Sequence, residues 1–322
     1  MRFRGAARAI RVTTGAVVSA ALVYWVARAV VSQLAEIERH AWTIRPALVA
    51  ASFVALAIAY GLYALLWRRL LADLGTRLDR ATALRVWMIA QLGKYVPGKV
   101  WGAVGRTVLV ARAGGDPLAA GLSIVYEIAL MVATGVVLAL AAFPLWRAGI
   151  SQVVFDRVGI AAPAIVAGAI LVSVFVPGTW RLAGRFAAWL VPGAAVPTLP
   201  LKRLPWLVFG YAATWLATAT GFALLLAALH PVRGTELPGA AAAFVFAWVA
   251  GMLVFVAPAG LGVREAVLLV YLDGLVPREV ALVVVVASRA WTTAVEVVGL
   301  AIALAWSGAH GSGRETDASA RA

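Results

Sequence analysis

Long apolar runs, separated by shorter stretches that hold most of the charged residues, make up nearly the whole chain. An α-helix rises about 1.5 Å per residue, so about 20 apolar residues are needed to cross the ~30 Å hydrocarbon core of a bilayer. Most of the runs reach that length, so the pattern predicts an all-α, polytopic membrane protein with about eight transmembrane helices. The runs are Val12–Val31, Pro46–Leu66, Leu118–Leu140, Ile160–Val176, Leu204–Leu229, Gly239–Val256, Glu265–Val276 and Val280–Leu304.

The overall composition indicates the same class of protein. Of 322 residues, 63% are hydrophobic and 13% are charged, whereas soluble domains average about 45–50% apolar and about 25% charged residues. No polar stretch is long enough to form a separate soluble catalytic domain. We expect one integral membrane domain over residues 1–306, followed by a disordered tail rich in Gly and Ser over residues 307–322.

The residue types that usually support metal, thiol or nucleotide chemistry are scarce. The chain has 0 cysteines, and its 3 histidines lie at segment ends or in the tail. We therefore expect no disulfide, no metal site and no cofactor. The phosphate-binding pattern Gly-x-x-x-x-Gly-Lys-Ser/Thr is missing from the sequence, which argues against ATP as a source of energy.

The charge balance predicts both a partner and an orientation. The formal net charge is +14, and in so apolar a chain this charge lies in the loops, which favours anionic lipid over nucleic acid. The positive-inside rule places the N-terminus, residues 67–117 and residues 181–203 on the cytoplasmic side of the plasma membrane. It places residues 32–45 and 230–238 on the other side. The first run has some features of a signal peptide, but the many runs that follow favour an uncleaved helix.

Residues 84–111 form a broken apolar segment rather than a plain loop. Pro97 and Gly98 interrupt it, so we expect two short helices that enter the membrane from the cytoplasmic side and return. Three cations lie within the segment: Lys94, Lys99 and Arg106. Three amphipathic aromatic rings suit the headgroup level: Trp87, Tyr95 and Trp101.

Residues 256–276 form a second broken segment. Its prolines and glycines are Pro258, Gly260 and Gly262, and they are followed by Arg264. The short apolar run after the break is either a re-entrant half-helix or the continuation of a broken helix. Paired Gly/Pro-interrupted segments are typical of the central site of a transporter. The alternative is that both breaks are packing kinks, at which glycine permits close contact between helices.

Charged residues also lie well inside two of the apolar runs. Glu127 lies near the middle of its run, and a lone carboxylate there is costly unless it is paired or protonated. Arg289 and Glu296 are two helical turns apart, so they share one face of the last run. We expect Glu127 to pair with Arg289, either as part of a substrate site or as a structural ion pair between helices.

Arg264 and Glu265 begin a helix directly after a glycine turn. An anion at that position would meet free N–H groups, the helix dipole and Arg264 together. Glu265 alternatively complements the dipole. Lys94, Lys99 and Arg106 are candidates for a facing cationic wall, and the alternative for them is ordinary positive-inside topology.

Two motifs in the broken segments resemble those of a known family. The first is Gly93-Lys94-Tyr95-Val96-Pro97-Gly98-Lys99-Val100-Trp101-Gly102, followed by Arg106, and the second is Pro258 to Glu265, followed by Arg289. They are similar to motifs of the lysylphosphatidylglycerol synthase transmembrane-region family, which is also described as flippase-like. Ala259 stands where the family usually has a glycine. The resemblance covers about Val12–Trp306.

The resemblance implies a polytopic fold with re-entrant helices that handles phospholipids or polyprenyl-linked lipids. The substrate-facing positions that it implies are Lys94, Lys99, Arg106, Arg264, Glu265 and Arg289. In the two-part family enzymes, aminoacyl transfer belongs to a soluble C-terminal domain, so we do not expect synthase activity in this chain.

Three functions remain open at this point. The first is a lipid flippase or transporter. The second is a membrane-embedded lipid transferase with Glu127 or Glu265 as general base, which ranks lower because no second catalytic group accompanies either carboxylate. The third is a non-catalytic partner or regulator in cell-envelope assembly, acting as a homo-oligomer or with another protein.

Overall fold

The computed structural model shows a helical protein, and every regular element in its described residues is a helix. The described residues are 24, 28, 31–32, 34–40, 42–95, 101–142, 197, 199–254 and 260–319. The α-helices in these ranges are α2 (Leu34–Arg39), α3 (Pro46–Asp73), α4 (Arg80–Gln91), α5 (Trp101–Arg112), α6 (Pro117–Ala141), α11 (Leu204–Leu229), α12 (Leu237–Leu253), α13 (Val263–Leu272) and α14 (Arg278–Ser319). Two short 3-10 helices accompany them, η1 (Leu92–Tyr95) and η3 (Leu201–Arg203).

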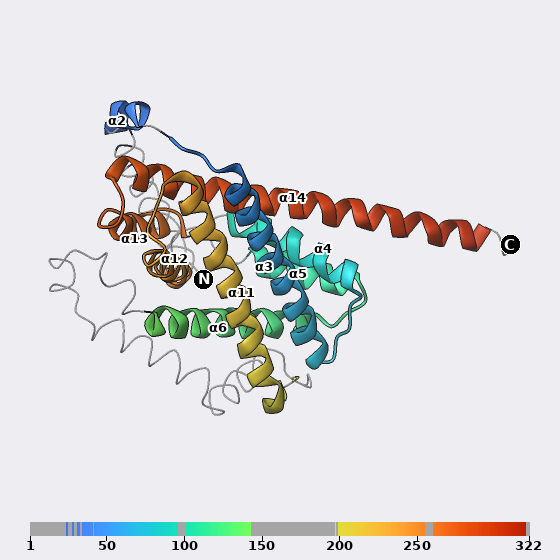
Figure 1. The fold of residues 1–322 in the computed structure, drawn as a ribbon. Helices are drawn as coiled ribbons and strands as arrows, with labels where there is room; N and C mark the ends of the chain where they lie inside the picture. The colour runs from blue at the N-terminus through green and yellow to red at the C-terminus, as the bar shows by residue number, and fades with distance from the viewer. Residues whose placement is uncertain are drawn as a thin grey trace, which may run out of the picture.

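Helices α3 and α11 form an antiparallel pair that runs through the molecule (Figure 1). Each has a proline within its first two positions. A backbone N–H at these positions would have no partner within the helix, so proline loses nothing by lacking one. The start of α3 is tied to the end of α11, because the N–H of Arg45 donates to the carbonyl of Ala228 at 2.9 Å. In an apolar solvent such long helices are favoured because they satisfy their own backbone hydrogen bonds.

Four further helices stack across this pair. Helix α14 packs on α4, α4 packs on α5, and α5 packs on α6, and in Figure 1 α14 and α6 cross the pair at different heights. Aspartate caps begin two of these helices. Asp79 accepts the N–H of Thr82 at 3.0 Å before α4, and Asp116 accepts the N–H groups of the first turn of α6. An N-cap aspartate satisfies otherwise unpaired N–H groups and so fixes where each helix starts.

The first broken segment contains a close approach between two stretches of backbone, and the second contains two glycines in a left-handed conformation. A Cβ added to Gly93 would lie 2.2 Å from the backbone N of Gly102, so η1 and the start of α5 meet at a point that only glycine permits. Between α12 and α13, Gly260 and Gly262 have φ values of +66° and +81°, which side chains disfavour. The chain therefore leaves the helix before α13, as the sequence predicts.

Four described helices are long and apolar enough to cross a membrane: α3, α6, α11 and residues Arg278–Ala305 of α14. Helix α12 is apolar but shorter, and α13 has 10 residues. Nearly all of the expected spans Val12–Val31 and Ile160–Val176 lies outside the described residues, as do Pro97, Gly98 and Pro258. The total of about eight spans and the re-entrant geometry therefore stay predictions.

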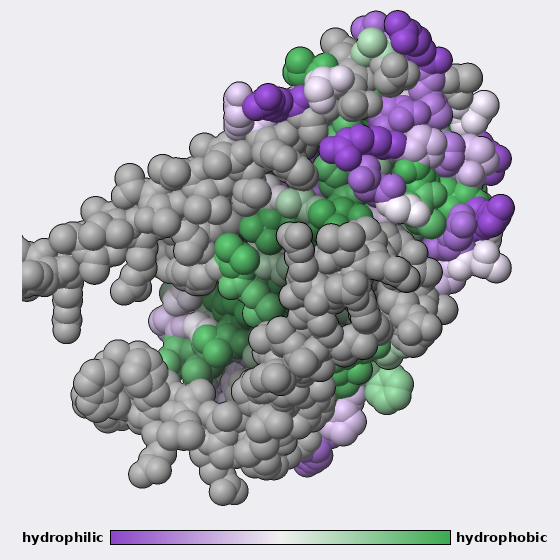
Figure 2. Space-filling view, turned by 90° about the vertical axis from the view of Figure 1, so that its left-hand side faces the viewer, coloured by the Kyte–Doolittle hydropathy of each residue, from purple (hydrophilic) through white to green (hydrophobic). Residues whose placement is uncertain are grey.

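Figure 2 shows how the side chains are distributed on one face of the molecule. Hydrophilic side chains gather toward the top of this view, and apolar side chains fill the hollow below them. That separation is the one expected for a protein whose middle lies in hydrocarbon and whose ends meet headgroups.

Candidate functional site

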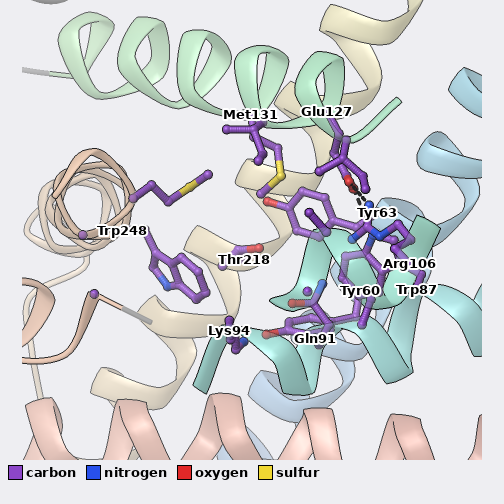
Figure 3. A pocket seen from close by; sticks show the side chains of 18 of the residues that line it. Tyr60, Tyr63, Trp87, Gln91, Lys94, Arg106, Glu127, Met131, Thr218 and Trp248 are labelled. Carbon is purple, nitrogen blue, oxygen red and sulfur yellow. Dashed lines mark hydrogen bonds and ion pairs between the residues drawn. The ribbon is translucent and has the colours of Figure 1, made fainter. Parts of the chain in front are cut away.

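A cavity of about 330 Å³ lies between the two broken segments and the helices that surround them. Residues from α3, α4, η1, α5, α6, α11, α12 and the start of the α13 segment line it. Figure 3 places Arg106 and Glu127 on one side of the cavity and Trp248 on the other. The charged residues in the described part of its wall are Lys94, Arg106, Glu127 and Arg264.

Arg106 and Glu127 form the first charged cluster in the wall. Both are buried, with 8% and 3% exposure, and the Nη1 of Arg106 donates to Oε2 of Glu127. The indole N–H of Trp87 donates to Oε1 of the same carboxylate at 2.9 Å. The Arg106 guanidinium also lies 5.0 Å from the centre of the Trp67 ring. Both oxygens of Glu127 are thus bound, and this ion pair is fixed between helices α5 and α6.

Lys94 and Glu296 form the second cluster. The Lys94 ammonium and the Tyr60 hydroxyl both donate to Oε1 of Glu296. Lys94 lies in η1, Tyr60 in α3 and Glu296 in α14. This cluster therefore ties the first broken segment to two long helices.

Arg264 differs from the other two cations of the wall. It is 6% exposed, and its guanidinium carbon stacks 3.6 Å from the centre of the Trp248 ring. Among the described residues, no carboxylate forms an ion pair with it, and no hydrogen bond from its guanidinium is found. An aromatic face stabilises a cation by about 0.5–2 kcal/mol, which is less than a buried charge loses by leaving water. Arg264 is therefore a buried cation whose charge is only partly compensated.

Glu265 and Arg289 lie beside the cavity rather than in its wall. Oε1 of Glu265 lies 3.6 Å from Nη1 of Arg289, and Oε2 accepts the N–H of Gly262 at 2.7 Å. Glu265 thus caps the start of α13, as one of the two sequence interpretations proposed. Because it occupies that N–H, the helix start offers fewer free donors to a ligand than the sequence alone indicated.

The structure brings most of the predicted site residues into one region. Lys94, Arg106, Glu127, Arg264 and Gly260 line the cavity. Glu296 binds a lining residue, and Glu265 and Arg289 lie next to Arg264 along the chain or in space. Gly262 caps α13, and Lys99 lies outside the described residues. The substrate-binding roles of these residues stay predictions.

One predicted contact is wrong. Glu127 pairs with Arg106 instead of Arg289, and Arg289 pairs with Glu265. The sequence indicates how deep each residue lies in its span but not which helix faces it. In the structure α6 packs on α5, while α13 packs on α14, so each charge meets the partner on its own neighbour.

Several aromatic residues of the wall were missed or misplaced. Trp87 was expected at the headgroup level but is 3% exposed and bound to Glu127. Tyr60 and Trp248 lie in uniformly apolar runs, where an aromatic residue looks like ordinary core or lipid-facing surface. Only their three-dimensional neighbours, Glu296 and Arg264, reveal a role in the site.

The described residues form no group of three or more side chains suited to hold a metal ion. Among the described residues that line the cavity, three are cations (Lys94, Arg106 and Arg264) and one, Glu127, is a carboxylate. Such a set favours an acceptor-rich, negatively charged ligand.

The comparison with protein families agrees with the sequence motifs. A family model described as "Lysylphosphatidylglycerol synthase TM region" matches residues 12–299, which is most of the chain. No curated protein sequence is similar enough to count as a relative. Together with the long apolar helices, the match shows a multi-pass membrane protein of a family linked to lipid handling. The chain belongs to the lysylphosphatidylglycerol synthase transmembrane-region family.

Proposed function

We propose that this protein moves anionic lipids across the membrane and that the cavity binds their headgroups. The observation that carries the proposal is Arg264, a buried cation in the cavity wall that forms no ion pair with a carboxylate of the described residues. Ionisable groups at membrane depth are costly and are usually kept for a function. A bound phosphate supplies the counter-charge that Arg264 lacks.

The other two cations of the wall leave Arg264 as the main group for binding an anion. Lys94 and Arg106 each contact a carboxylate, so their charges are largely neutralised within the protein. Arg264 is therefore the group from which an incoming anion gains most. Lys94 is the second candidate, because its side chain is 25% exposed, against 9% for that of Arg106.

The size of the cavity indicates which part of a lipid it holds. Ligand pockets range over about 300–1,000 Å³, and this cavity, at about 330 Å³, lies at the low end. It fits a phosphate-bearing headgroup, while acyl or polyprenyl chains remain in the surrounding bilayer. The left-handed glycines Gly260 and Gly262 before α13 are suitable hinges for exposing the headgroup to each side in turn.

The contacts between helix ends support the predicted grouping of the loops on two sides of the membrane, and we propose that the membrane is the plasma membrane, with the N-terminus in the cytoplasm. Two regions assigned to the cytoplasmic side meet where Arg203 lies 3.7 Å from Asp73. Two regions assigned to the other side meet where the rings of His40 and His230 lie 5.8 Å apart. We propose that residues 1–306 act as one integral domain in this orientation.

The direct test uses proteoliposomes with fluorescent phosphatidylglycerol and a membrane-impermeant quencher. Vesicles with the wild-type protein should lose more than the outer-leaflet fluorescence, because inner-leaflet lipid reaches the quencher. Arg264→Gln should abolish this additional loss of fluorescence. Arg233→Gln, which changes an exposed arginine in a loop, should keep it.

Two results would overturn the proposal. One is that wild-type vesicles behave like empty ones for phosphatidylglycerol and for polyprenyl phosphates. The other is that Arg264→Gln moves lipid at the wild-type rate. Formation of a new lipid product from a soluble donor would instead favour a transferase.

A further inference from the structure

The side-chain amide of Gln91 is an accessible polar group in the cavity wall. Gln91 is the last residue of α4, and it lines the cavity, where Figure 3 labels it. The residue is half-buried, and neither atom of its amide is among the fully buried polar atoms. No hydrogen bond between this amide and another described residue is found. A ligand in the cavity can therefore reach both the amide oxygen and the amide N–H groups.

Two hydroxyl groups of the described wall differ from Gln91, because their donors are already bonded within the protein. The Tyr60 hydroxyl donates to Glu296. The Thr218 hydroxyl donates to the carbonyl of Thr214 at 2.8 Å. These bonds fix both hydroxyl groups between or along helices, whereas the amide of Gln91 keeps its donors and its acceptor for a ligand.

The amide lies on the same face of the chain as two groups of the charged clusters. Trp87 precedes Gln91 by four residues and Lys94 follows it by three, and all three residues line the cavity. Residues three and four positions apart are neighbours on a helix surface. Trp87 donates to Glu127, so Gln91 stands between the Glu127 cluster and Lys94.

Lys94 connects this face with Arg264. Its ammonium lies 5.9 Å from the centre of the Trp248 ring, and the Arg264 guanidinium stacks 3.6 Å from the same centre. A phosphate that approaches Arg264 therefore lies near Lys94, and the part of the headgroup beyond the phosphate can extend toward Gln91.

An amide responds to a feature of the headgroup that cations do not distinguish. The cations of the wall attract charge, and the charge is the same in every simple phosphodiester headgroup. A carboxamide has one acceptor oxygen and two N–H donors, and a hydroxyl group can both donate and accept. The amide is thus suited to separate a hydroxylated headgroup from an unsubstituted one of equal charge.

We propose that Gln91 is a specificity-determining residue that hydrogen-bonds hydroxyl groups of the headgroup whose phosphate Arg264 holds. This assignment rests on the proposed function, because it needs the headgroup to bind at Arg264. It narrows the substrate class to phosphodiester lipids whose headgroup carries hydroxyl groups. Both the glycerol of a phospholipid and the sugar of a polyprenyl phosphate have this chemistry.

The test compares lipids that differ in these hydroxyl groups. Dioctanoyl phosphatidylglycerol and dioctanoyl phosphatidylpropanol have the same charge and the same carbon skeleton in the headgroup. Binding of each to the purified protein is measured by calorimetry in detergent. The wild-type protein should bind phosphatidylglycerol about tenfold more tightly, because two ordinary hydrogen bonds together contribute roughly that factor. A polyprenyl hexosyl phosphate and the matching polyprenyl methyl phosphate form a second pair, and a preference in that pair alone would identify a sugar as the source of the hydroxyl groups.

Gln91→Met removes the amide and keeps the length of the side chain. It should reduce the preference to within about twofold by weakening the binding of the hydroxylated lipid alone, because the other lipid forms no hydrogen bond with the amide. Thr220→Val, which changes an exposed residue of α11 outside the described cavity wall, should keep the preference. If Gln91→Met does not fold, Gln91→Leu takes its place.

The outcomes separate this assignment from the proposed function. If the wild-type protein binds anionic lipids but prefers neither member of either pair, the proposed function stands and the role of Gln91 is wrong. The role is also wrong if the preference survives in Gln91→Met, or if that variant weakens both members of a pair equally, as a change in cavity shape would. If the wild-type protein binds no anionic lipid, both proposals fail.

Discussion

Replacing Gly93 by alanine should disrupt the first broken segment. The added Cβ would lie 2.2 Å from the backbone N and 2.4 Å from the Cα of Gly102, where ordinary contacts begin at 3.4 Å. The first turn of α5 would thus have to move by about 1 Å. Overpacking a well-packed site typically costs about 1–3 kcal/mol. We expect about 3 kcal/mol here, because the obstacle is backbone and cannot change rotamer.

The displacement should reach the cavity as well as the stability of the fold. Gly102 and Arg106 of α5 both line the cavity, so shifting the first turn of this helix weakens the contact between Arg106 and Glu127. Unfolding of the purified protein, followed by tryptophan fluorescence during denaturant titration in detergent, gives the free energy directly.

Gly105→Ala is the matched control. It adds the same methyl group to the same helix, but nothing lies within 4 Å of the new Cβ. Replacing a glycine inside a helix by alanine usually stabilises the helix by about 0.5–1 kcal/mol. Equal stability of Gly93→Ala and Gly105→Ala would refute the close approach of η1 and α5.

Three further predictions follow from other contacts. Glu127→Ala should lower the free energy of unfolding by about 3–5 kcal/mol, because it leaves Arg106 buried without its counter-charge; adding Arg106→Ala should recover much of that loss in the same titration. Asp79→Ala should cost about 1 kcal/mol in that titration, because it removes the cap of α4. Burial and the nearby His40 lower the pKa of His230, which lies just beyond the end of α11. The neutral form is therefore favoured in the folded state, so stability should be full above pH ~6.5 and fall as the pH drops below that value. Thermal unfolding of His230→Gln should show less of this decline, and an equal decline in both proteins would contradict the assignment.

The sequence predicts the end of a helix correctly where the helix and its apolar run end at the same residue. The sequence predicts Leu204–Leu229, and α11 has the same bounds. Helix α3 was predicted to end at Leu66 but continues to Asp73. Trp67, Leu70 and Leu71 are fully buried beyond the predicted end, so packing within the protein extends the helix past the arginines that interrupt its apolar pattern.

The candidate site was predictable in its charges but not in its contacts. Charged residues in apolar runs are conspicuous in a sequence, which is why Lys94, Arg106, Glu127 and Arg264 were found. Their partners depend on the rotation and neighbours of each helix, which hydrophobicity does not determine. Trp248 carries no sequence signal at all, because its place in the site arises from the contact with Arg264 on another helix.

The claim that Arg264 binds an anionic headgroup is tested most directly by native mass spectrometry. The purified protein is mixed with equal amounts of phosphatidylglycerol and phosphatidylcholine, and the lipids that remain bound are counted. The wild-type protein should retain phosphatidylglycerol preferentially, and Arg264→Gln should lose that preference while Arg233→Gln keeps it. An unchanged preference in Arg264→Gln, or no preference in the wild type, would contradict the account.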